Sequence, residues 1–160
     1  MRFIHSILIF LSLLSVQAQK TSITQLEVDK LVNPVGLDSK SPNFSWIIKS
    51  DDYNMNQTHY QVFVATDKTF SSKSLVWDSG KVNSSESVYV KYRGKPLEYA
   101  TKYYWTVKVW TNQSTRPKQS KISSWTTGLM GKNQWKSDWI GVNNDDKKGP
   151  KSPYFTKDFV

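Results

Sequence analysis

LEYATKYYWTVKVW, residues 97–110, decides the fold, because it joins a turn to the most regular period-2 pattern in the sequence. From position 103 onward, successive side chains point to opposite faces, as they do in a β-strand. The side chains expected on the core face are those of Tyr103, Trp105, Val107 and Val109. Trp110 has the opposite parity to Trp105, so we expect it to point away from the core.

The start of this stretch has the spacing of a tyrosine corner. Leu97, Thr101 and Tyr103 stand where such a corner places them, with the Tyr hydroxyl turned back onto the backbone a few residues upstream. The corner occurs in two-sheet Greek-key sandwiches. The stretch resembles the L-x-P-x-T-x-Y-x-x-x-V signature of fibronectin type III domains, with Tyr99 where that family often has Pro. This resemblance implies a fold and no chemistry.

Six further stretches carry strand patterns between turn residues. The strands that we expect, besides residues 103–110, lie at residues 23–31, 44–49, 58–66, 75–82, 87–92 and 122–127. Residues 112–120 are strongly polar and are predicted to form a hairpin loop. Trp46 is expected in the core on the second strand. Seven short strands without a helical period predict an all-β, fibronectin type III or immunoglobulin-like sandwich over residues 19–128.

Residues 1–18 have the features of a signal peptide. Arg2 precedes an apolar run at residues 7–14, and Val16-Gln17-Ala18 is a small-x-small cleavage site. The apolar run is too short to span a bilayer. We therefore expect cleavage after Ala18 and export to the periplasm or the extracellular space, with an uncleaved amphipathic anchor as the alternative.

Residues 129–160 do not continue the sandwich pattern. We interpret them as a linker followed by the incomplete start of a second β domain. An apolar strand expected at residues 154–160 has no partner within this chain. This favours the interpretation that the chain is the front of a longer protein.

The sequence gives no sign of a metal, cofactor or catalytic site. It contains no Cys, and its two histidines are His5 and His59, which cannot make a closed zinc site. The acidic pairs at residues 51–52 and 145–146 lie in polar loops with no apolar pocket that could raise a carboxyl pKa. We therefore assign no catalytic residue, no cofactor and no metal ligand.

The net charge is +9, and it falls to about +8 if Arg2 leaves with the signal peptide. Nearly all of the positive charge comes from Lys. These lysines stand singly between apolar strand residues and form no stripe in the sequence. This pattern favours solvated strand faces and argues against a nucleic-acid partner.

A series of motifs along the chain resembles the N-terminal region of bacterial α-L-rhamnosidases. The motifs are L-x-V-x-x-x-x-N-P-x-G-L-D at residues 26–38, F-S-W at 44–46, D-S-G-K-V at 78–82, Y-x-W-x-V-x-V-W at 103–110, S-S-W-T at 123–126 and W-x-x-x-W-I-G at 135–141. Residues 153–159 are similar to the P-x-[LF]-R-K-x-F strand of the domain that follows in that family, with Thr156 in place of Arg.

The resemblance implies an exported glycoside hydrolase that removes terminal α-L-rhamnose. In that family, paired carboxylates in an (α/α) barrel much further along the chain carry out inverting hydrolysis. That barrel is absent from these 160 residues. The implied role of this chain is to brace the catalytic region, with the remaining domains of the parent enzyme as partners and a rhamnose-containing polysaccharide as a further candidate partner.

Four aromatic residues are candidate platforms for sugar stacking: Trp77, Tyr99, Trp110 and Trp125. Core or inter-domain packing is the alternative for each of them. Trp110 and Trp77 are the two that we retain as sugar-stacking candidates. Trp135 and Trp139, four residues apart, are expected to pin the next domain.

Two other functions remain open. A stand-alone carbohydrate-binding or adhesion module of fibronectin type III fold would need no attached enzyme. A eukaryotic receptor-type domain is the other alternative, since four asparagines begin N-x-[ST] sequons, namely Asn43, Asn56, Asn83 and Asn112.

Overall fold

A computed structural model describes residues 21–129, 131, 135–138 and 156–158 of this chain. The chain divides into two compact units, Met1–Met130 and Gly131–Val160. The fold below is that of the first unit. The expected signal peptide at residues 1–18 lies outside the described residues.

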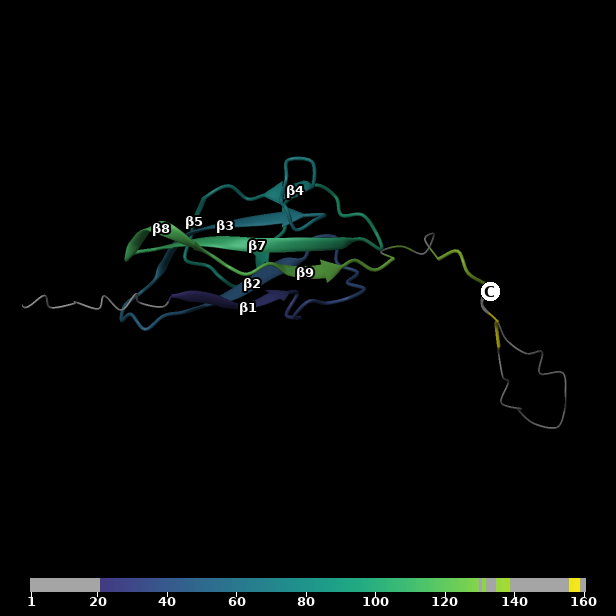
Figure 1. The fold of residues 1–160 in the computed structure, drawn as a ribbon, viewed down its shortest axis with the longest axis horizontal. Helices are drawn as coiled ribbons and strands as arrows, with labels where there is room; N and C mark the ends of the chain where they lie inside the picture. The colour runs from purple at the N-terminus through teal and green to yellow at the C-terminus, as the bar shows by residue number, and fades with distance from the viewer. Residues whose placement is uncertain (1–20, 130, 132–134, 139–155, 159–160) are drawn as a thin grey trace, which may run out of the picture. The chain divides into compact units, whose positions relative to one another are not determined.

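All regular elements among the described residues are strands (Figure 1). Their bounds are β1 (Ser22–Val28), β2 (Asn43–Lys49), β3 (Gln57–Ala65), β4 (Leu75–Asp78), β5 (Val82–Asn83), β6 (Val90–Lys91), β7 (Lys102–Thr111), β8 (Ser114–Gln119) and β9 (Ser123–Thr126).

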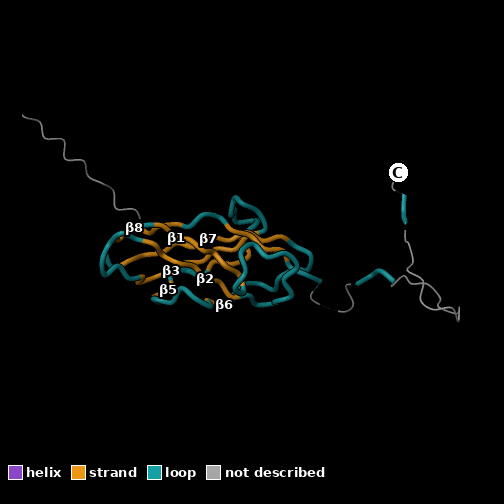
Figure 2. The backbone as a smooth tube through the Cα atoms, turned by 90° about the horizontal axis from the view of Figure 1, so that it is seen from below, coloured by secondary structure: helices purple, strands orange, loops and turns teal. Residues whose placement is uncertain are grey.

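The strands form two antiparallel sheets. One sheet has the order β1-β2-β6, and the other has the order β4-β3-β7-β8, with β5 also paired to β3 and β9 also paired to β7. Because β4 and β5 share one neighbour, and β8 and β9 share another, the nine described strands fill seven positions. Figure 2 shows these strands together in the body of the domain. The predicted all-β immunoglobulin-like sandwich is confirmed.

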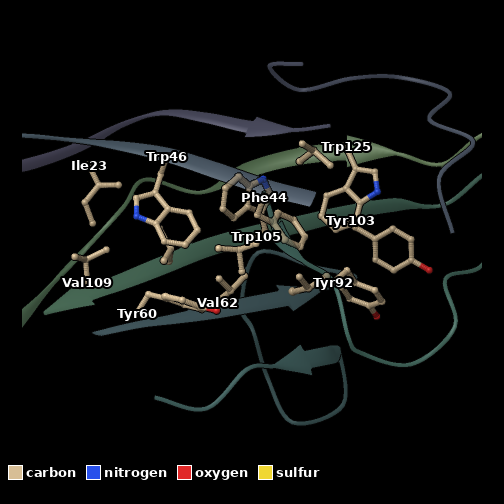
Figure 3. Close-up of a cluster of buried hydrophobic side chains, with 14 residues drawn as sticks. Ile23, Phe44, Trp46, Tyr60, Val62, Tyr92, Tyr103, Trp105, Val109 and Trp125 are labelled. Carbon is tan, nitrogen blue, oxygen red and sulfur yellow. The ribbon is translucent and has the colours of Figure 1, made fainter. Parts of the chain in front are cut away.

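The core lies between the inward faces of the two sheets. All four side chains predicted for the core face of residues 103–110 are buried. Phe44 from β2 packs between Trp105 and Trp125 of the opposite sheet, with ring centroids 4.7 Å and 5.6 Å away (Figure 3). Trp46 packs against Tyr60, and its Nε1–H donates to the Gln57 carbonyl oxygen Oε1 at 3.0 Å. The period-2 pattern therefore predicts the core correctly.

The prediction of a hairpin loop at residues 112–120 is wrong. Ser114–Gln119 is a strand, β8, which pairs with β7 through Lys108 and Gln119 and through Val109 and Lys118. All six side chains of β8 are exposed. An edge strand with both faces in solvent has no apolar side to alternate with, so its sequence carries no period-2 signal.

Three predicted strands are shorter than expected. The first ends at Val28, because Asp29 and Lys30 take positive φ angles of 47° and 67° and form a tight turn. Residues 75–82, expected as a short strand closed by a Gly turn, form β4, which ends at Asp78, and then a turn at Gly80, whose φ is +65°; β5 begins after this turn. Of residues 87–92, only Val90–Lys91 is a strand.

The strand predicted at residues 154–160 is described only at residues 156–158, and these three lie in no strand. The rest of that prediction, together with Trp139, lies outside the described residues. Trp135 is 54% exposed.

Candidate functional site

The carboxyl end of the sandwich is held on one side by residues 33–38 of the β1–β2 connection. The Leu37 N–H donates to the Thr126 carbonyl, and the Gly128 N–H donates to the Leu37 carbonyl, both at 2.9 Å. These bonds make a parallel bridge to the end of β9. The Thr126 N–H also donates to the Pro34 carbonyl at 2.9 Å. Residues 33–38 therefore act as a short additional strand beside β9.

Asn33 ties the start of the same segment to the start of β9. Its Oδ1 accepts hydrogen bonds from the Ser123 hydroxyl (2.9 Å) and from the Ser124 N–H (3.0 Å). Asn33 has φ 49° and Gly36 has φ +76°, conformations that Asn tolerates and that Gly adopts without strain. The N-P-x-G-L-D motif thus encodes a bent segment that can follow β9.

Thr127 holds the other side of the chain end. Its hydroxyl donates to the Glu98 carbonyl at 2.7 Å and accepts from the Thr101 N–H at 3.0 Å. Its own N–H donates to the Thr101 carbonyl at 3.0 Å, and the Ala100 N–H donates to the Gly128 carbonyl at 3.1 Å. Thr127 is only 2% exposed, so these bonds form away from water.

Tyr103 fixes the turn that carries these partners. Its hydroxyl oxygen accepts from the Glu98 N–H at 2.8 Å, which confirms the predicted tyrosine corner. Its ring stacks on Trp125, with centroids 5.2 Å apart and planes inclined by 26° (Figure 3). Burial raises the pKa of the Tyr103 phenol, against the lowering effect of the hydrogen bond from Glu98.

A side chain at Gly128 would meet residues 33–38 at close range. A Cβ at this position would overlap Oδ1 of Asp38 and would lie 3.0 Å from the Gly36 carbonyl oxygen. The last residue of the bonded segment is therefore enclosed by residues 33–38 on one face.

Together, residues 33–38, 98–101 and 123–128 form what we call the exit clamp. It grips the last residues of the sandwich through backbone and hydroxyl groups on both sides of one strand. Such bonds hold the last residues of the domain in place. The arrangement suits a structural role, which is to set the path along which the chain leaves the domain.

Other candidate chemistry is not assembled in the described residues. There, no three side chains of His, Cys, Asp or Glu come together as a metal site would require. Asp51 and Asp52 lie in the loop between β2 and β3, whereas residues 145–146 lie outside the described part. Nor does the described part include a helix long and apolar enough to cross a membrane.

The four candidate residues for sugar stacking differ in how far the structure exposes their side chains. Trp125 is 1% exposed and belongs to the core, so it offers no platform. Tyr99 is 46% exposed. Trp77 is partly buried and packs on Phe44 and Tyr92, with ring centroids 6.0 Å and 5.1 Å away. Its remaining surface lines a cleft between the two sheets.

Trp110 lies outside the buried core, as its parity predicts. The Lys81 ammonium lies 4.8 Å from its ring centroid. Further ammonium groups lie over outward rings of the same sheet, those of Lys108 over Phe63 and of Lys68 and Lys102 over Tyr104. The lysines between apolar strand positions therefore shield aromatic rings while their charges stay in solvent.

The sequence analysis found the motifs of the exit clamp but missed its central residue, Thr127. The available signal was a Thr directly after a core strand and directly before a Gly, which is too common to single out. The charged side chains of the cleft beside Trp77, Glu86 and Arg93, also carried no motif. They stand seven residues apart, on either side of β6, and only the fold brings them beside Trp77.

Comparison with known proteins places this arrangement in a family. Residues 23–131 match the family described as the Rha78A-like, N-terminal immunoglobulin domain. An α-L-rhamnosidase of Formosa agariphila is 39% identical over 132 residues, which cover 78% of this chain and 14% of the relative. An α-L-rhamnosidase of Streptomyces avermitilis is 42% identical over 120 residues, covering 75% of this chain and 12% of the relative.

The crystal structure of the Streptomyces avermitilis α-L-rhamnosidase complexed with L-rhamnose superposes with a TM-score of 0.73 at 40% identity, over 78% of this chain and 12% of that one. The chain thus spans about one-eighth of the length of the curated relatives that it matches. The matched family is an N-terminal domain, and the matched part of this chain is the sandwich with its exit clamp. The chain belongs to the family of Rha78A-like N-terminal immunoglobulin domains.

Proposed function

We propose that this chain is the N-terminal part of an exported α-L-rhamnosidase, in which the sandwich braces and orients the catalytic region. The exit clamp is the observation that carries this proposal. A domain that serves as a rigid brace must hold the end of its own chain, and here hydrogen bonds hold it on both sides. The relatives of this family that we matched are α-L-rhamnosidases, and the chain spans only 12–14% of their length.

In this proposal the parent enzyme removes terminal α-L-rhamnose from glycans or glycosides. Its catalytic carboxylates lie in domains beyond residue 160, and these domains are the partners of the sandwich. Residues 129–160 serve as the linker and the start of a second β domain, in which Trp135 and Trp139 pack against the following structure.

The proposal includes export. Residues 1–18 act as a signal peptide that is removed after Ala18, so the mature protein starts at Gln19 in the periplasm or outside the cell. Sequencing of the mature N-terminus tests this directly. A mature protein that retains Met1 would contradict it.

We also infer the fibronectin type III variant of the fold. Support comes from the fourth strand, β4, which pairs with β3. In a constant-type immunoglobulin domain the fourth strand joins the sheet of the first two strands instead.

The decisive experiment is to read the coding DNA past Val160 and to express the whole reading frame. We expect an α-helical barrel with clustered Glu and Asp, and hydrolysis of a chromogenic α-L-rhamnoside by the whole protein. The 160-residue chain alone should be inactive. A reading frame without such a barrel, or a whole protein that does not cleave the rhamnoside, would overturn the proposal.

The bracing role has its own test in the whole enzyme. Thr127→Val removes the hydroxyl that joins Glu98 and Thr101, and we expect it to lower the temperature of thermal inactivation. Thr127→Ser keeps the hydroxyl and is the matched control. Equal behaviour of the two variants would count against the clamp, whatever the activity of the enzyme.

A second candidate function is carbohydrate binding by the sandwich itself, as a glycan-binding or adhesion module. It is favoured by the aromatic residues that lie outside the closed core, Trp110 on the outer sheet face and Trp77 in the cleft. A sugar ring on Trp110 would have to displace the Lys81 ammonium. Trp110→Ala should then abolish retention of the chain on a rhamnose-containing polysaccharide, and unchanged retention would exclude Trp110.

A further inference from the structure

A cleft opens between the two sheets, where β6 ends one sheet and β4 and β5 end part of the other. Its volume is about 400 Å³, within the range of about 300–1,000 Å³ that is typical of small-molecule sites. The aromatic side chains of Tyr60, Trp77 and Tyr89 line it together with charged ones. In Figure 3, Tyr60 lies on the same side of the core as Tyr92, below the strand that carries Trp105.

The charged groups of the cleft are Glu86, Lys91 and Arg93. All three residues are exposed, and none of their charged groups forms an ion pair or a hydrogen bond within the described part of the chain. The charge of the cleft is thus one negative and two positive groups that are free to bind a ligand. Lys30, whose ammonium lies 5.4 Å from the Tyr89 ring centroid, adds positive charge nearby.

The walls of the cleft are anchored to the core. Gln57, which bonds to Trp46 in the core, donates from Nε2 to the carbonyls of Ser84 (3.1 Å) and Glu86 (2.7 Å). The Tyr89 N–H donates to the Ser45 hydroxyl at 3.1 Å. Because these segments are already held in place, a ligand would not have to order them on binding.

Two of the charged groups of the cleft act on the phenol of Tyr60, which also lines it. Burial raises the pKa of Tyr60, Glu86 raises it further, and Arg93 acts in the opposite direction. The hydroxyl therefore stays protonated at neutral pH. It can donate a hydrogen bond to a ligand in the cleft, which also carries the anionic Glu86 and the cationic Arg93.

We propose that this cleft binds one sugar-acid unit, a hexuronate, of an acidic glycan. The aromatic walls of Trp77 and Tyr89 suit the apolar face of a pyranose ring. Arg93 and Lys91 suit its carboxylate, and Glu86 and the Tyr60 hydroxyl suit its hydroxyl groups. The cleft shares no lining residue with the exit clamp, and the proposal does not depend on the activity of any parent enzyme.

The test is an NMR titration of the ¹⁵N-labelled 160-residue chain with α-1,4-linked digalacturonate at constant ionic strength. We expect saturable shifts of the amides of Glu86, Tyr89 and Arg93 at millimolar concentrations or below. The neutral digalactose of the same linkage should bind at least about tenfold more weakly, since a hydrogen bond to a charged group contributes a factor of that order. Sodium acetate should not reproduce the shifts.

Two variants separate the cleft from general charge effects. Arg93→Gln should weaken binding at least about tenfold, whereas Arg116→Gln, which removes the same charge from exposed β8, should change it less than about twofold. Tyr89→Asn removes the aromatic wall at a residue with φ 58°, which Asn tolerates, and should weaken binding about two- to tenfold. Each variant must keep the dispersed amide spectrum of the parent chain.

The proposal is overturned if no saturable shift occurs, or if Arg116→Gln weakens binding as much as Arg93→Gln. It is also overturned if neutral digalactose binds equally well, or if acetate alone saturates the same amides. A double-stranded DNA oligonucleotide that shifts the same amides more strongly than digalacturonate would replace it with a nucleic-acid site. None of these outcomes bears on whether the whole enzyme cleaves rhamnosides.

Discussion

Trp46 is one of the largest fully buried side chains of the core. Its side chain is 1% exposed, packs on Tyr60 and has its indole N–H bonded to Gln57. Trp46→Ala removes this packing and leaves the buried amide oxygen of Gln57 without a partner. We expect a loss of about 3–5 kcal/mol in the free energy of unfolding, comparable to the stability of a small domain.

Urea denaturation followed by circular dichroism measures this loss. Trp110→Ala, a substitution of the same residue type on the outer face, is the control and should cost less than about 1 kcal/mol. Similar losses for the two variants would mean that the assignment of core and outer faces is wrong.

A substitution at Gly128 that adds one methyl group tests the packing of the exit clamp. Gly128→Ala makes the exposed Asp38 carboxylate move aside and leaves Cβ 3.0 Å from the Gly36 carbonyl oxygen, so we expect a loss of about 1 kcal/mol in unfolding free energy, the lower end for overpacked sites. In the double variant with Asp38→Ala, part of this loss should be recovered because the nearest atom is gone. Additive effects in that double-mutant cycle would contradict the contact.

At the scale of elements, the sequence predicts best those strands that bury one face. Trp105 and Val107 on β7, and Tyr60 and Val62 on β3, alternate with outward residues and are buried as expected. β8 could not be predicted in this way, because backbone pairing to β7 forms it and no side chain of β8 is buried. The bent segment at residues 33–38 was visible as a motif, but its partner strand lies about 90 residues further along the chain.

β8 also predicts how the domain avoids association through its edge. Pro117 has no N–H to offer, and Arg116 and Lys118 bring charge to an exposed edge strand, devices that prevent strand addition. The double variant Pro117→Val, Lys118→Val should associate at concentrations where the parent chain stays monomeric. Light scattering measures this. The same two changes made at exposed loop positions Pro96 and Lys95 are the control and should leave the chain monomeric.

At the scale of the whole molecule, buried phenols predict the response to alkaline pH. Burial raises the pKa of Tyr92 and of Tyr103 above the ordinary value of 10.0. The folded state therefore holds these protons more tightly than the unfolded state does. The stability that they contribute is fully present below about pH 10 and is lost as the pH rises through the folded-state pKa values.

These two phenols should leave the melting temperature nearly unchanged between pH 7 and 9. Above about pH 10 their ionisation in the unfolded state should lower it. Differential scanning calorimetry across this range tests the expectation. Tyr92→Phe removes one of the titrating groups and should make the fall less steep. An increase in melting temperature above pH 10 would contradict the assigned direction.

The whole-molecule view also shows what no single segment could reveal. Trp77 was visible in the sequence as a candidate for sugar stacking, but the cleft beside it needs Tyr60 from β3, Glu86 from a loop and Arg93 from beyond β6. In a Lys-rich sequence, Glu86 and Arg93, seven residues apart, look like ordinary solvated positions. Only the packing of the two sheets brings them beside Tyr60 and Trp77.

The exit clamp has a mechanical consequence. Consider a pull on the chain at Leu129 that is directed along β9. Residues 33–38 run parallel to this strand on one flank, and the turn at residues 98–101 holds Thr127 and Gly128 on the other. The load then falls on several hydrogen bonds at once, in shear, and cannot open them one after another like a zipper. Tension applied to the chain at Leu129 would therefore reach the sandwich as a whole before it could detach the final strand.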